Sequence, residues 1–134
     1  MSKDYKKIAR AVISTEIDGL KKLRKSINIS FNKAVELILK TEGKLVFCGI
    51  GKSGLIARKA AATLSSVGQP SFYIDGNEFS HGDSGSVTKK DVVIIYSSSG
   101  ETNELKKVIT YCSRMGVKLI SICQKKNSKN SNIH

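Results

Sequence analysis

Two turns rich in glycine and hydroxyl side chains contain the residues of this chain best suited to chemistry. Residues 49–54 read GIGKSG and residues 97–102 read SSSGET, and each follows an apolar run. A helix that begins at such a turn presents unpaired backbone N–H groups and the positive end of its dipole, and both attract phosphate. The hydroxyl groups add further hydrogen-bond donors. The two turns together therefore predict one crevice that binds a small phosphorylated ligand.

The first turn is open to other interpretations. Its glycines satisfy the dinucleotide-binding pattern G-x-G-x-x-G, and Asp75 lies at about the 20-residue spacing of a ribose-binding acid. Against this, Lys52 inside the loop and the second hydroxyl-rich turn have no role in a dinucleotide site. A Walker A loop is excluded, because it requires glycine where Val46 stands. A tight strand-to-helix turn without a ligand remains the structural alternative.

Two further side chains could take part in proton transfer. His81 lies in the polar segment 76–87, and it is the only histidine outside the C-terminus. Histidine titrates near neutral pH, so His81 could move protons, although a lone histidine is usually structural or solvated. Glu104 follows Glu101 by three residues on the expected helix. The helix dipole explains Glu101, whereas Glu104 could reach a ligand held at the turn.

The elements that must position these residues follow from hydrophobic periodicity. The N-terminal part predicts a helix over residues 4–27 and a second one capped by Ser30. Short continuous apolar runs then alternate with helical patterns. This alternation predicts an α/β fold with a doubly wound parallel sheet, in which ligands bind at the carboxyl ends of the strands. The expected strands are residues 45–48, 71–74, 92–96 and 119–123, and the expected helices between them are residues 57–67 and 102–115.

Composition limits the class of protein. The chain has 134 residues, enough for one domain, and its net charge of +12 could attract nucleic acid. Its lysine clusters have no interleaved aromatic residues, so we expect solvated helix faces and no nucleic-acid partner. No apolar run approaches the roughly 20 residues of a membrane span, and the N-terminus does not resemble a signal peptide. We therefore expect a cytoplasmic protein that does not bind a membrane, with three reduced, structural cysteines.

Three motifs together carry a family resemblance. GIGKSG at residues 49–54, SHGD at 80–83 and SSSGETNE at 97–104 resemble the sugar isomerase (SIS) domain, and within it the bacterial arabinose-5-phosphate isomerases. The resemblance extends to about Gln124. It implies a flavodoxin-like sheet of five parallel strands and assembly into dimers or tetramers. It also implies interconversion of D-arabinose 5-phosphate and D-ribulose 5-phosphate for 3-deoxy-D-manno-octulosonate synthesis, in lipopolysaccharide or capsule formation. It calls for no cofactor and no metal.

The resemblance also assigns roles to single residues. An aldose–ketose isomerisation through an enediol needs a base, a proton shuttle and a positive charge beside the developing oxyanion. The matching positions are Glu104 as a candidate base, His81 as the shuttle and Lys52 as the electrostatic stabiliser. The residues expected to bind the substrate are Gly51, Ser53, Ser97, Ser98, Ser99, Gly100, Glu101 and Thr102.

The C-terminus departs from the family pattern. The family continues past the fourth strand with another helix, a fifth strand and further catalytic acid and histidine positions. We therefore expect a C-terminally truncated member with an N-terminal helical segment (1–44), an incomplete SIS domain (45–124) and a polar basic tail (125–134), and the truncation could make it inactive. Two other functions stay open: a non-catalytic phosphosugar-binding regulatory module and a dinucleotide-binding fragment.

Overall fold

The computed structural model describes residues 3–99 and 103–124. The chain forms two compact units, residues 1–33 and residues 34–134. The described N-terminal part is helical, as the periodicity predicts. Helix α1 (Tyr5–Ser26) is capped by Asp4, whose carboxylate accepts a hydrogen bond from the Lys7 backbone N–H at 3.2 Å. Among the described residues, no helix is both long and apolar enough to cross a membrane.

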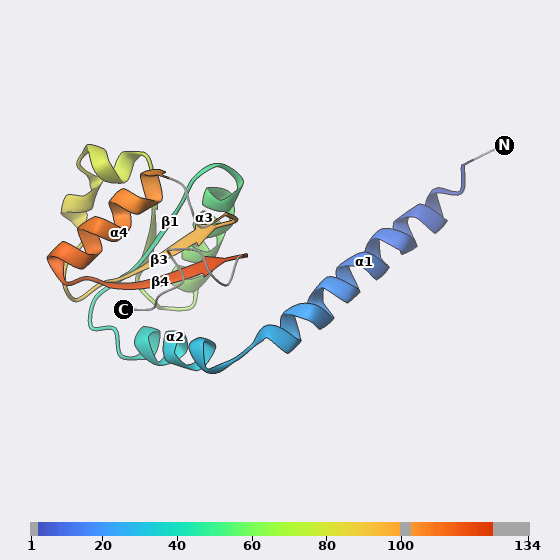
Figure 1. Cartoon of the computed structure of the whole chain (residues 1–134), viewed down its shortest axis with the longest axis horizontal. Coiled ribbons are helices and arrows are strands. Elements are labelled where there is room, and N and C mark those ends of the chain that lie inside the picture. Colours follow the sequence, from blue (N-terminus) through green and yellow to red (C-terminus); the bar gives the residue numbers. More distant parts are fainter. Residues whose placement is uncertain (1–2, 100–102, 125–134) are drawn as a thin grey trace. The chain divides into compact units, whose positions relative to one another are not determined.

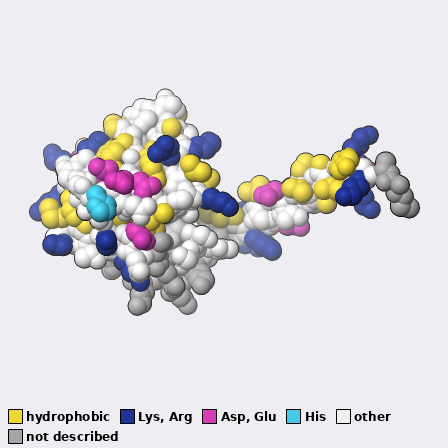
Figure 2. Space-filling model, turned by 90° about the horizontal axis from the view of Figure 1, so that it is seen from above, with side chains coloured by type: hydrophobic (Ala, Val, Ile, Leu, Met, Phe, Trp, Pro, Cys, Tyr) yellow, Lys and Arg dark blue, Asp and Glu magenta, His cyan; other side chains and the backbone are white. Residues whose placement is uncertain are grey.

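Helix α1 keeps its apolar side chains exposed. None of its residues is buried, and apolar side chains gather along the helix (Figure 2). Helix α2 (Ile29–Leu39) begins two residues earlier than a cap at Ser30 allows, because a helix capped by Ser30 would begin at Phe31. Asn28 takes that role instead, because its side-chain oxygen accepts the Ser30 N–H at 2.9 Å. The prediction of Ser30 as the cap was therefore wrong: Ser30 lies inside the first turn.

Four parallel strands form the sheet of the second unit: β1 (Leu45–Gly49), β2 (Ser71–Asp75), β3 (Val92–Ser97) and β4 (Lys118–Cys123). Their order is β2-β1-β3-β4, as in the first four strands of a flavodoxin-like sheet. The register places Gly49 beside Asp75 and Ser97 beside Cys123. Both predicted turns therefore leave the sheet at the same edge. The family resemblance implies five strands, and the described part of the chain contains these four.

Helices cover both faces of the sheet (Figure 1). Helix α3 (Gly51–Ser66) packs Ala57 and Ala61 against one face, together with the partly buried Leu37 of α2. Helix α4 (Asn103–Met115) packs the other face. The strands are apolar on both sides because successive residues point to opposite faces and both faces are covered. This arrangement confirms the doubly wound α/β fold.

The segment expected to be a polar loop is more ordered than its composition suggests. It forms two short 3₁₀ helices, η1 (Glu78–His81) and η2 (Asp83–Ser86). Phe79 and Val87 are buried in the same core as α4. These two apolar side chains favour folding of the polar segment onto the sheet, since each gains by leaving water.

Candidate functional site

A hollow of about 390 Å³ lies at the carboxyl edge of the sheet. Ser53 reaches it from the first predicted turn, and Ser97, Ser98 and Ser99 reach it from the second. Ile50, Leu105 and Gln124 complete its lining. The two turns are far apart in the chain, yet they meet because β1 and β3 are neighbours in the sheet. The predicted shared crevice is therefore present.

The first turn depends on close backbone packing. A Cβ on Gly49 would lie 2.9 Å from the Gly54 nitrogen, and one on Gly54 would lie 2.5 Å from the Tyr73 hydroxyl. Gly51 has open space around it but adopts a φ of +59°, which favours glycine. No side chain caps the start of α3. The first backbone N–H groups of α3 are therefore not occupied by a capping side chain. A turn that binds phosphate needs its N–H groups in this state.

The second turn presents hydroxyl groups at the end of β3. Ser97 is buried, and Ser98 and Ser99 are exposed. The Ser98 hydroxyl donates a hydrogen bond to the side-chain oxygen of Gln124 at 3.3 Å. Gln124 was not among the predicted site residues. Its position directly after β4, at the carboxyl end of a strand, could have identified it. The predicted binding residues Gly100, Glu101 and Thr102 lie outside the described residues.

None of the three predicted catalytic residues lines the hollow. Lys52 is exposed in the first turn of α3, and Glu104 is half-buried in the first turn of α4. His81 is exposed as the last residue of η1. The segment that leads to η1 starts at the hollow, because a Cβ on Gly76 would touch Ile50 at 2.7 Å and Leu105 at 3.2 Å.

Tyr73 and Asp75 support the first turn from strand β2. The Tyr73 hydroxyl lies 3.0 Å from the Gly49 carbonyl oxygen and 3.2 Å from the Asp75 carboxylate, and it can donate to either. The other Asp75 oxygen accepts the Asn77 N–H at 2.9 Å. Burial, and then the charge of Asp75, raise the pKa of Tyr73 to about 12, so the phenol keeps its proton at neutral pH. The role of Tyr73 was not predicted, since its partner Gly49 is 24 residues away.

Asp75 therefore has a structural role. Both of its carboxylate oxygens already contact hydrogen-bond donors within the chain, one the Tyr73 hydroxyl and the other the Asn77 backbone. The dinucleotide interpretation needs this acid for a ribose hydroxyl. The structure supplies a different reason for an acid at the end of β2, and the main argument for that interpretation is weakened.

Two buried cysteines are unsuited to act as nucleophiles. Cys48 and Cys112 are free of disulfides and lie in the core under α4. Burial raises the pKa of each thiol to about 12. Both are neutral at physiological pH, whereas the thiolate is the reactive form. Within residues 3–99 and 103–124, no group of three or more histidine, cysteine or acidic side chains is arranged to hold a metal ion.

A doubly wound sheet with hydroxyl-rich turns at its carboxyl edge defines a class of α/β proteins that bind phosphorylated ligands. Comparison with known families narrows this class. The SIS domain model matches residues 38–132. The chain therefore belongs to the SIS domain family, as the sequence motifs indicated.

Individual relatives are similar over nearly the whole chain. The "Probable arabinose 5-phosphate isomerase" of Haemophilus influenzae is 42% identical over 93% of this chain, and "Arabinose 5-phosphate isomerase KdsD" of Yersinia pestis is 39% identical over 96%. The solved structure of an E. coli CFT073 protein in complex with arabinose 5-phosphate superimposes with a TM-score of 0.90 at 38% identity. That match covers 98% of this chain and 70% of the other. The chain spans 37% and 38% of the lengths of the two curated relatives.

Proposed function

We propose that this chain is the sugar-phosphate-binding part of an isomerase that interconverts D-arabinose 5-phosphate and D-ribulose 5-phosphate. The observation that carries the proposal is the convergence of Ser53 with Ser97, Ser98 and Ser99 on one hollow. Two relatives named as arabinose 5-phosphate isomerases and a structural relative solved with arabinose 5-phosphate support the same substrate. The resemblance would place the reaction before 3-deoxy-D-manno-octulosonate synthesis.

The phosphate would bind at the start of α3. There the first backbone N–H groups have no capping side chain, and Ser53 lines the same hollow as Ser98 and Ser99. A phosphate held between two turns gains several hydrogen bonds to charged oxygens, which are stronger than bonds between neutral groups. The sugar would extend from this anchor towards the residues around the rim, and Gly100, Glu101 and Thr102 would complete the binding turn.

The isomerisation moves one proton between adjacent carbons. A base removes the proton from C2 of the aldose, a proton passes from the O2 to the O1 side of the enediol, and C1 is then protonated to give the ketose. We assign the first step to Glu104, the hydroxyl proton transfer to His81 and stabilisation of the oxyanion to Lys52. Lys52 and Glu104 are sequence neighbours of Ser53 on α3 and Leu105 on α4, which line the hollow. His81 comes from η1, which contributes no residue to that lining.

A titration with D-arabinose 5-phosphate tests binding and turnover in one sample. We expect NMR shifts of the amides of Ser53 and Ser97–Ser99, and slow appearance of D-ribulose 5-phosphate. Glu104→Gln should keep the shifts and lose turnover, because the amide cannot take a proton. Glu42→Gln, which removes a carboxylate that precedes β1, should change neither. Absence of shifts at both turns would refute the proposed site.

A non-catalytic phosphosugar-binding module is the second candidate. It is favoured by one observation: Lys52, His81 and Glu104 do not line the hollow that the serines form. Binding of D-arabinose 5-phosphate without any turnover, under conditions in which a full-length relative is active, would select this candidate over the isomerase.

We further propose that the chain forms a homo-oligomer, a dimer or tetramer. The supporting observation is the exposed apolar side of α1, where Val12, Ile17 and Leu20 are 55%, 46% and 65% exposed. Exposed apolar stripes of this kind usually mark contacts with other protein surfaces. Light scattering should give a mass of two or four chains, and Ile17→Lys with Leu20→Lys should reduce it to one. A monomeric wild-type chain would refute this proposal.

A further inference from the structure

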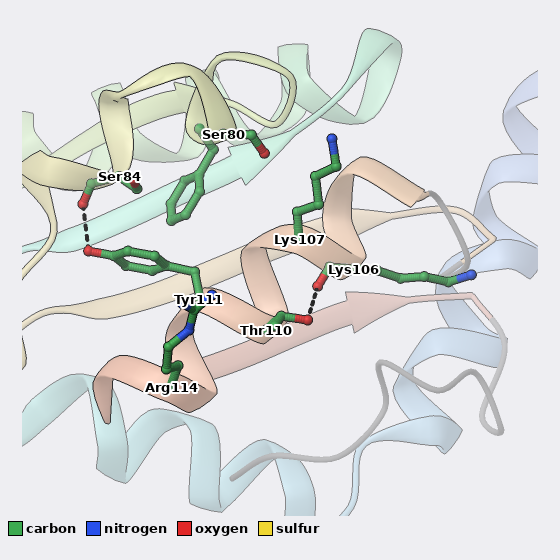
Figure 3. A pocket seen from close by; sticks show the side chains of 8 residues that line it. Ser80, Ser84, Lys106, Lys107, Thr110, Tyr111 and Arg114 are labelled. Carbon is green, nitrogen blue, oxygen red and sulfur yellow. Dashed lines mark hydrogen bonds between the residues drawn. The ribbon is translucent and has the colours of Figure 1, made fainter.

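A second groove lies on the outer side of α4, apart from the crevice. It has a volume of about 360 Å³ and shares no lining residue with the crevice. Its walls are α4 and the two 3₁₀ helices η1 and η2 (Figure 3). Small-molecule sites typically start at about 300 Å³. The residues that line it are Phe79, Ser80, Ser84, Lys106, Lys107, Thr110, Tyr111 and Arg114.

The groove is strongly basic. Its lining contains three cations and no carboxylate. Lys106 already has a partner, because its ammonium donates a hydrogen bond to the Asn103 side-chain oxygen at 3.2 Å. In the described part of the chain, no ion pair involves Lys107 or Arg114. These two positive charges are therefore available to a ligand.

The two available cations share one face of α4 with hydrogen-bonding groups between them. Lys107, Thr110, Tyr111 and Arg114 follow the spacing i, i+3, i+4, i+7, which places them in a row. A separation of seven residues corresponds to about 10 Å along the helix axis. Figure 3 shows Lys107 rising towards Ser80 on η1, so a hydroxyl group faces the row from the opposite wall.

The walls of the groove are fixed to each other. The Tyr111 hydroxyl donates to the Ser84 carbonyl oxygen at 2.9 Å, and its ring meets Phe79 edge to face with centroids 5.3 Å apart. Phe79 is buried, which anchors η1 to the core. A groove held in this way needs little rearrangement to bind a ligand, and preorganisation of this kind favours affinity.

We propose that this groove is a second anion site that takes a small molecule with two phosphate groups or one diphosphate. The phosphates would span Lys107 and Arg114, with the Ser80 hydroxyl as an additional donor. The Thr110 hydroxyl already donates to the Lys106 carbonyl oxygen at 2.9 Å. Arginine and lysine are the common binders of phosphate oxygens. The positions of Lys107 and Arg114 on α4 are about 10 Å apart along the helix axis, so two phosphate groups can each take one of the two cations. This site does not depend on the proposed isomerase function, since it uses none of the residues assigned to that reaction.

An NMR titration of the full chain with inorganic pyrophosphate, at constant ionic strength, tests the site. We expect saturable shifts of the amides of Ser80, Lys107 and Thr110. Lys107→Gln and Arg114→Gln should each weaken binding about tenfold, as the loss of one charge-assisted contact predicts. Lys59→Gln is the matched control. It removes an exposed lysine from α3, which covers the other face of the sheet, and should leave the affinity unchanged.

Three results would overturn the proposal. The shifts could be confined to the amides of Ser53 and Ser97–Ser99, so that pyrophosphate occupies the crevice alone. They could grow linearly without saturation, as expected for general charge screening. Lys59→Gln could weaken binding as much as Lys107→Gln. Failure of D-arabinose 5-phosphate to bind, by contrast, would count against the proposed function and leave the groove unaffected.

Discussion

Replacing Asp91 by asparagine should destabilise the sheet by about 3 kcal/mol. The Asp91 side chain has no exposed surface and lies just before β3. It accepts the backbone N–H groups of Lys44 and Thr88, each at 2.7 Å, and the Thr88 hydroxyl at 3.1 Å. The Lys44 ammonium lies 3.3 Å away. One carboxylate therefore connects the amino ends of β1 and β3.

The expected loss of folding free energy in Asp91→Asn follows from the number of hydrogen-bond donors that contact the carboxylate. An asparagine at this position keeps one acceptor oxygen, so at least one of the two backbone N–H groups faces an amide nitrogen and loses its partner. A hydrogen bond to a charged group contributes roughly 1.5–3 kcal/mol, and a buried donor left unpaired costs about 1–3 kcal/mol more. The ion pair itself adds little, because the Lys44 side chain is 43% exposed. Lys44→Gln should therefore cost less than about 1 kcal/mol.

The effect should also depend on pH. Burial alone raises the pKa of Asp91, but hydrogen bonds from the Lys44 and Thr88 backbone, the Thr88 hydroxyl and the Lys44 ammonium outweigh it and hold the pKa below its ordinary value. Because the folded pKa is lower than the unfolded one, ionised Asp91 stabilises the fold above pH about 4. That contribution is lost as pH falls through the folded pKa. The difference between wild type and Asp91→Asn should shrink there.

Urea unfolding of wild type, Asp91→Asn and Lys44→Gln at pH 7, and of wild type and Asp91→Asn at about pH 2–3, measures these differences. A cost below about 1 kcal/mol for Asp91→Asn would mean that the buried carboxylate is no better than a neutral amide. An equal cost for Lys44→Gln would assign the stabilisation to the ion pair instead of the backbone hydrogen bonds. A difference that stays constant with pH would show that ionisation is not its source.

Two further predictions concern the first turn and the core thiols. Gly49→Ala should destabilise the fold by about 2 kcal/mol and reduce sugar-phosphate binding, because its Cβ would meet backbone atoms of Gly54. Gly51→Asn, which tolerates the positive φ and has open space, should cost about 1 kcal/mol or less in thermal unfolding; equal costs would contradict the packing argument. Cys48 and Cys112, with thiol pKa values of about 12, should be alkylated by iodoacetamide at pH 8 at least about a hundredfold more slowly in the folded than in the urea-unfolded chain. Mass spectrometry of the labelled peptides checks this, and equal rates would show that both thiols are accessible.

The sequence was sufficient for the architecture, because that information is local. Apolar runs separated by helical patterns predicted the four strands and the helices, and the doubly wound sheet followed from strands that are apolar on both sides. The crevice could also be predicted from local information, namely the two glycine- and hydroxyl-rich turns. In a parallel sheet, a turn that follows a strand must lie at the carboxyl edge, so Ser53 and Ser97 had to face the same side.

Local patterns were less reliable where a few side chains decided the outcome. The polar composition of residues 76–87 suggested a loop, yet the burial of Phe79 and Val87 folds part of it into η1 and η2. At the start of α2, both Asn28 and Ser30 are good capping residues. The choice between them depends on where the helix begins, which sequence patterns specify least well.

Only the tertiary structure could decide the contacts between residues far apart in the chain. Asp91 follows two lysines and looks like a solvated loop residue, but its partner Lys44 is 47 residues away. Tyr73 reads as a strand residue, and its hydroxyl supports the Gly49 turn across β1 and β2. The basic groove forms only because α4 lies beside η1. In the sequence, the charged and hydroxyl side chains of each element do not indicate a binding site. Periodicity specifies which face of an element is buried, whereas the pairing of particular polar groups depends on how the elements are brought together in space.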